Sequence, residues 1–132
     1  MEMLAANAAN TGRYASLVEP GSRAVRTGFD ASRESVLNAD LGHYRYVHFA
    51  THGKIDSRYP ALSWLAFSQY DPAGQETRGL VRLHDIYRFK LNADLVTMSA
   101  CDTALGRRIS GEGLTGLVQG FMYSGARAVL AS

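Results

Sequence analysis

The sequence predicts an α/β domain in which helices flank a largely parallel β-sheet. Two observations support this fold class. Short runs rich in aromatic, β-branched and aliphatic residues recur at residues 44–51, 94–100 and 127–132, as in buried strands. Segments with helical periodicity or turn residues separate these runs. The last run reaches the end of the 132-residue sequence, so we expect the sheet to be incomplete in this chain.

The N-terminal part of the sequence has the weakest pattern. Residues 2–17 contain enough alanine and leucine for a helix, although Asn-Thr-Gly interrupts it. Pro-Gly-Ser at residues 20–22 predicts a turn. We therefore expect residues 1–27 to form a poorly defined helix or linker region, and residues 28–132 to form the partial domain.

The first well-defined helix is predicted over residues 31–41. Asp30 is a suitable N-cap residue, and Gly42 follows the last periodic position, where glycine commonly ends a helix. The strand at residues 44–51 follows directly, and His52 with Gly53 stands at its carboxyl end.

The rest of the chain continues with alternating short elements. Helix 113–124 is predicted because its apolar residues share one face, which is typical of a helix packed on a core. Those residues are Leu114, Leu117, Val118, Phe121 and Met122. The other predicted elements are strand 62–68, turn 71–74, strand 80–83, helix 84–89, strand 94–100 and a strand from residue 127.

Composition excludes several classes of protein. The chain has 14 basic and 12 acidic residues and no Lys/Arg-rich run, so nucleic-acid binding is not expected. A single cysteine, Cys101, allows no internal disulfide, which argues against a disulfide-stabilised secreted domain. The N-terminus lacks the pattern of a signal peptide, and no apolar run is long enough to span a membrane. We expect a cytoplasmic protein that contacts no membrane.

Two reactive side chains follow predicted strands. His52 comes directly after one strand and Cys101 directly after another, 49 residues later. Because the carboxyl ends of parallel strands meet at one edge of a sheet, these side chains are candidates for a shared site. An imidazole can stabilise the thiolate, which is the nucleophilic form of cysteine, and can then protonate a leaving amine. The backbone amides of Gly53 and Cys101 are candidates for an oxyanion hole.

Other interpretations of these residues compete with the dyad. A lone buried cysteine is commonly a small hydrophobic residue of the core. His48 and His52 would suit zinc only on a helix, whereas the pattern predicts a strand. Gly111 to Gly116 match G-x-G-x-x-G, but ten residues separate Gly111 from the preceding strand, so a helix start is favoured over a nucleotide site. Neither a cofactor nor a metal is expected.

Three polar residues near the candidates are possible parts of a substrate pocket: Asp56, Asp102 and Thr103. A carboxylate there would favour a basic residue before the scissile bond. Hydrogen bonding within turns is an equally good explanation of all three residues.

Several motifs together resemble the CHAT domain, the caspase-like domain associated with TPR repeats. They are residues 48–53 (HFATHG), 85–87 (DIY), 95–103 (LVTMSACDT), 111–114 (GEGL) and 121–126 (FMYSGA). The resemblance covers about residues 28–132. It implies a caspase-like fold and a cysteine endopeptidase that acts on a protein or peptide substrate. His52 matches the catalytic histidine, Cys101 the nucleophile and Gly53 the oxyanion glycine. It also implies TPR repeats in the parent protein. The alternative is a catalytically inactive scaffold or signalling module.

Overall fold

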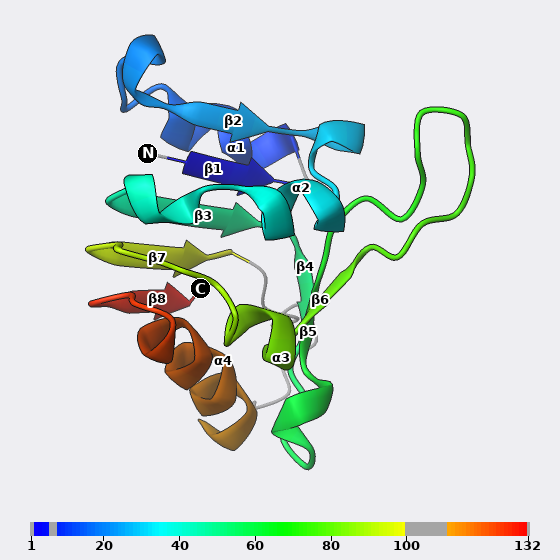
Figure 1. Cartoon of the computed structure of the whole chain (residues 1–132), viewed down its shortest axis with the longest axis vertical. Coiled ribbons are helices and arrows are strands. Elements are labelled where there is room, and N and C mark those ends of the chain that lie inside the picture. Colours follow the sequence, from blue (N-terminus) through cyan, green and yellow to red (C-terminus); the bar gives the residue numbers. More distant parts are fainter. Residues whose placement is uncertain (1, 6–7, 100–110, 132) are drawn as a thin grey trace.

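The computed structural model describes residues 2–5, 8–99 and 111–131, and its centre is a five-stranded parallel sheet (Figure 1). The strands lie in the order β2-β1-β3-β7-β8. Their bounds are β1 Glu2–Ala5, β2 Ala24–Arg26, β3 Tyr46–Ala50, β7 Leu95–Met98 and β8 Val129–Ala131. The predicted α/β fold with a largely parallel sheet is confirmed.

A second, smaller sheet adjoins the carboxyl ends of the parallel strands (Figure 1). It is antiparallel, in the order β4-β5-β6. The bounds are β4 His52–Lys54, β5 Trp64–Ala66 and β6 Leu80–Arg82. Only one residue, Thr51, separates β3 from β4, so the chain passes directly from the large sheet into the small one.

Helices cover both faces of the large sheet. Their bounds are α1 Ala8–Ala15, α2 Arg33–Asn38, α3 Leu83–Ile86 and α4 Gly111–Tyr123. On one face, Phe121 of α4 stacks on Phe49 of β3, with ring centroids 5.4 Å apart. On the other face, Tyr14 of α1 contacts His48 of the same strand. No helix within the described residues is long and apolar enough to cross a membrane.

The core gathers around Phe49, which is fully buried. Its ring lies 6.2 Å from that of Phe67 and 6.5 Å from that of Phe89, in addition to the contact with Phe121. Leu117 and Phe121 of α4 are buried as predicted, but Met122 is 50% exposed. The predicted apolar face of this helix is therefore too wide at its carboxyl end.

The N-terminal residues differ from the prediction. Residues 2–5 form strand β1 instead of the start of a helix, and β1 lies between β2 and β3 in the large sheet. Only residues 8–15 of the predicted helix are helical. Because β2 also falls before residue 28, residues 1–27 contribute two strands to the sheet and are not a separate helix or linker region.

The predicted boundaries of the helix at residues 31–41 were also wrong, because α2 covers Arg33–Asn38. The N-cap is Ser32, whose hydroxyl accepts a hydrogen bond of 3.0 Å from the backbone N–H of Ser35. The Ser35 hydroxyl accepts one of 3.1 Å from the N–H of Ser32 in return. This reciprocal pair satisfies two backbone donors, so the helix begins after Ser32, whereas Asp30 lies in a 3-10 turn. The helix ends at Asn38, before Gly42.

Candidate active site

The site begins where the two central strands end. β3 and β7 are adjacent and parallel, with Phe49 opposite Met98. The backbone N–H of Ser99 donates a hydrogen bond of 2.9 Å to the carbonyl of Phe49, which continues this alignment past the end of β7. His52 follows β3 in the sequence by two residues, and Cys101 follows β7 by three. Cys101, Asp102 and Thr103 lie outside the described residues.

His52 is the first residue of β4, and its side chain is exposed. It lies opposite Ala66 of β5, and Gly53 lies opposite Leu65. The buried hydroxyl of Thr51 donates a hydrogen bond to the carbonyl of Ala66. This bond ties the corner between the two sheets to the strand beside His52, so it fixes the direction in which His52 leaves the large sheet.

Asp56 follows β4 and closes a turn. Its Oδ1 accepts hydrogen bonds of 3.0 Å from the N–H of Arg58 and 2.8 Å from that of Tyr59. Its own N–H donates to the hydroxyl of the buried Ser63 at 3.0 Å. These contacts are the turn hydrogen bonds that the sequence allowed as one of two roles for Asp56.

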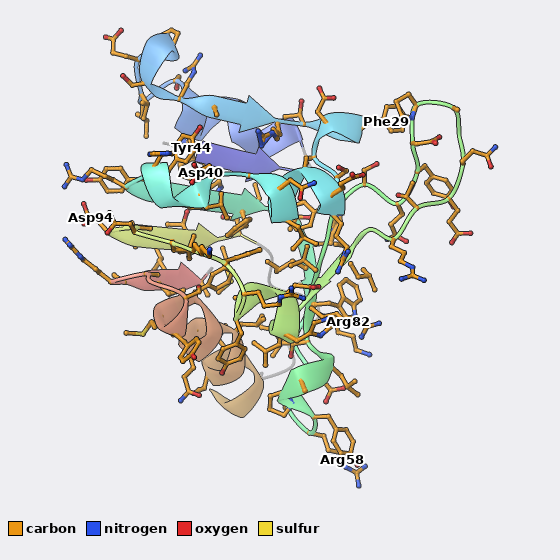
Figure 2. The ribbon with its side chains drawn as sticks, in the orientation of Figure 1. Phe29, Asp40, Tyr44, Arg58, Arg82 and Asp94 are labelled. Atoms are coloured by element: carbon orange, nitrogen blue, oxygen red, sulfur yellow. The ribbon has the colours of Figure 1, made fainter. Side chains whose placement is uncertain are left out.

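The outer face of the small sheet carries two cations and a tryptophan that were not predicted from the sequence as part of the site. Lys54, Trp64 and Arg82 lie directly opposite one another across β4, β5 and β6. Residues paired in this way share one face of a sheet. Figure 2 shows Arg82 on the side of the small sheet that faces away from the large one. No pattern within a single strand identifies this row, because its three members come from three separate strands.

His48 lies apart from His52. It is 95% buried on β3, and its Nδ1 forms a hydrogen bond with the hydroxyl of Thr97 on β7. Its Nε2 has no hydrogen-bond partner within the described part of the chain. His48 and His52 thus occupy two different sheets, not one helix as a zinc pair would need. The described residues hold no group of three or more metal-ligating side chains.

The burial of His48 predicts a pH-dependent stability. Burial lowers the pKa of His48 below its ordinary 6.5, because the charged imidazolium would lose its hydration. Below pH 6.5 the unfolded chain therefore binds more protons than the folded chain, and stability falls as the pH decreases. We expect urea unfolding to show this loss between pH 7.5 and 5.5 at up to about 1.4 kcal/mol per pH unit.

The His48→Gln variant should lose this component of the pH dependence. His43→Gln is the matched control, because His43 is exposed and only pairs with Asp40 on the surface. Equal pH slopes for wild type and His48→Gln would contradict the prediction.

The glycine motif at residues 111–116 forms the first turns of α4 and not a loop. A Cβ atom on Gly116 would lie 3.0 Å from Cβ of Pro60, which explains why a small residue occupies this position. In a dinucleotide site these glycines would form the turn between a strand and the following helix. The motif is therefore a helix start, which is the interpretation that the sequence favoured over a nucleotide site.

Comparison with known proteins agrees with this topology. A family model described as CHAT domain matches residues 1–132. No curated protein matches the chain. The family match extends across the whole sequence and includes β1 and β2, which the quoted motifs did not cover. It also includes His52 and Cys101. The chain therefore belongs to the CHAT domain family, which is caspase-like and related to peptidases.

Proposed function

We propose that this domain is a cysteine endopeptidase in which Cys101 is the nucleophile and His52 transfers the protons. The observation that carries the proposal is the adjacent, parallel pairing of β3 with β7. This pairing places the ends of both strands at one edge of the sheet, and the two candidate residues follow those ends in the sequence. Membership of a peptidase-related family supports the same chemistry.

The proposed reaction has two halves. In the first, the Cys101 thiolate attacks the peptide carbonyl carbon, and the amides of Gly53 and Cys101 stabilise the oxyanion that forms. Collapse of this intermediate breaks the C–N bond, and protonated His52 gives its proton to the departing amine. In the second, His52 removes a proton from water as it attacks the thioester. The carboxylic acid leaves, and the thiolate is restored.

His48 and His52 differ in exposure to solvent, and this difference separates their roles. The exposed His52 can reach a substrate and exchange protons with solvent. The buried His48 has its Nδ1 bonded to Thr97 and cannot contact a bound peptide. His52 is therefore the histidine assigned to proton transfer. TPR repeats elsewhere in the parent protein, as possible regulators, stay a prediction.

The test is the rate of Cys101 alkylation as a function of pH, which needs no known substrate. In an assembled dyad the pKa of the thiol should lie well below the ordinary value of about 8.5. It should rise toward that value in His52→Ala, because the imidazolium no longer stabilises the thiolate. His43→Ala should leave it unchanged, since His43 precedes β3 at the opposite end of the large sheet.

Circular dichroism must first show that each variant is folded. A thiol of ordinary pKa in a folded wild-type chain would contradict the peptidase proposal. That outcome would support the alternative function, a scaffold or signalling module that keeps the fold without cleaving peptides.

A further inference from the structure

On the outer face of the small sheet, one cation lies on each side of a tryptophan. This row is next to the row that contains His52. In one row Lys54, Trp64 and Arg82 are direct neighbours across the three strands. In the next row His52 lies opposite Ala66, which lies opposite Leu80. The reverse face is part of the core, because Leu65 and Val81 are buried there. The alternation of side chains in a strand therefore turns Lys54, Trp64, Arg82 and His52 away from that face. Ala66, which lies between His52 and Leu80, is itself buried.

The positive charge of this face is not neutralised by its own strands. The nine residues of β4, β5 and β6 include two cations and His52 but no carboxylate. Neither Lys54 nor Arg82 forms a side-chain ion pair with a residue in the described ranges. The acidic residues nearest in sequence are already engaged: Asp56 caps its turn, and Asp85 pairs with Arg33 at 2.9 Å.

A hollow of about 480 Å³ continues the face along the outer edge of β6. Leu80 and Arg82 line it together with Arg78. Glu76 also lines it, as do Arg33 and Asp85, which pair with each other. Apart from that pair, two arginines and one carboxylate line the hollow. Trp64 and Leu80 provide apolar contact area, and the cations provide charge selectivity.

We propose that this face, defined by Lys54, Trp64 and Arg82, binds an acidic segment of the polypeptide substrate. The inference rests on the proposed peptidase function, because His52 identifies the site where the substrate must lie. Two residues along a strand span about 7 Å, so the charged row lies one such step from His52. An extended substrate has the same repeat. A glutamate or aspartate close to the scissile bond can therefore reach the cations while its carbonyl is at the dyad.

This proposal differs from the earlier alternative, in which a pocket lined by carboxylates prefers a basic residue in the substrate. Of the three residues considered for that pocket, Asp56 has its Oδ1 occupied by two backbone N–H groups. The other two, Asp102 and Thr103, lie outside the described residues. The charges that the structure does place beside His52 are positive, and they select for carboxylates.

The single tryptophan of the chain, Trp64, reports binding at this face directly. We would titrate the Cys101→Ala chain with a blocked, alternating Glu-Ala octapeptide and follow the emission of Trp64, with no dependence on cleavage. The octapeptide should shift the emission, and added salt should weaken its binding. Lys54→Glu/Arg82→Glu should raise the Kd by about tenfold or more.

The matched control is Arg13→Glu/Lys90→Glu, which makes the same change of net charge at two exposed positions away from the small sheet. Its Kd should equal that of the parent chain. The proposal is overturned if the charge-reversed row binds the octapeptide unchanged, or if a Lys-Ala octapeptide or a single-stranded oligonucleotide binds more tightly. If Cys101 had an ordinary thiol pKa but the face still bound the acidic octapeptide, only the assignment of Cys101 and His52 as catalytic residues would be removed.

Discussion

Replacing Gly125 with alanine is expected to lower the free energy of unfolding by about 4 kcal/mol or more. Gly125 follows the end of α4 by two residues and has φ at +117°, in the region that L side chains rarely adopt. A Cβ atom there would lie 2.1 Å from the carbonyl oxygen of Leu91, which is inside any allowed contact distance. The obstacle is backbone and cannot rotate away, because the N–H of Leu91 is bonded to the carbonyl of Ser124 at 2.8 Å.

The loss would be a large fraction of the whole stability of a small domain, which is typically about 5–15 kcal/mol. Thermal unfolding followed by circular dichroism should show Tm lowered by at least about 10 °C. Gly12→Ala is the matched control: Gly12 lies inside α1, with no atom within 4 Å of an added Cβ. It should leave Tm unchanged or slightly raised. A Gly125→Ala chain with the Tm of the wild type would contradict this close packing of Gly125 against Leu91.

Five strands that the sequence predicts are present, as β3, β5, β6, β7 and β8, and the two central ones have the clearest sequence pattern. β3 and β7 are buried on the core face and covered on the other, so their sequences are nearly continuous apolar runs that stand out locally. β1 was missed because Glu2–Ala5 is short and contains no β-branched or aromatic residue. Its strand conformation comes from its place between β2 and β3, a tertiary effect that local propensity does not report.

In the candidate site, too, some residues could be predicted from the sequence and others could not. His52 was accessible from the sequence because it directly follows a recognisable strand. The row of Lys54, Trp64 and Arg82 was not, because its members are ten or more residues apart and only the register of three strands brings them together. Strand β4 itself, His-Gly-Lys, carries no β-strand signal. It becomes a strand because Thr51 anchors the corner before it to β5.

The edge of that small sheet depends on one ion pair, and its loss is the second large effect expected. Arg33 of α2 donates from Nη2 to Oδ1 of Asp85 at 2.9 Å, and from Nε to the carbonyl of Leu80 on β6 at 2.9 Å. The Asp85 side chain is 6% exposed and that of Arg33 29%. Arg33→Met should lower the free energy of unfolding by about 3 kcal/mol, because it leaves a buried carboxylate without its cation.

Asp85 would keep only the hydrogen bond of 3.0 Å from the N–H of Arg82 and a contact of 3.4 Å with the Nε2 of His84. Adding Asp85→Asn to Arg33→Met removes the stranded charge, so the double variant should be more stable than Arg33→Met alone in urea unfolding. Asp40→Asn, which breaks the exposed pair with His43, should change stability little. A double variant no better than Arg33→Met would mean that Arg33 acts through Leu80, by holding β6 in place, and not through the charge of Asp85.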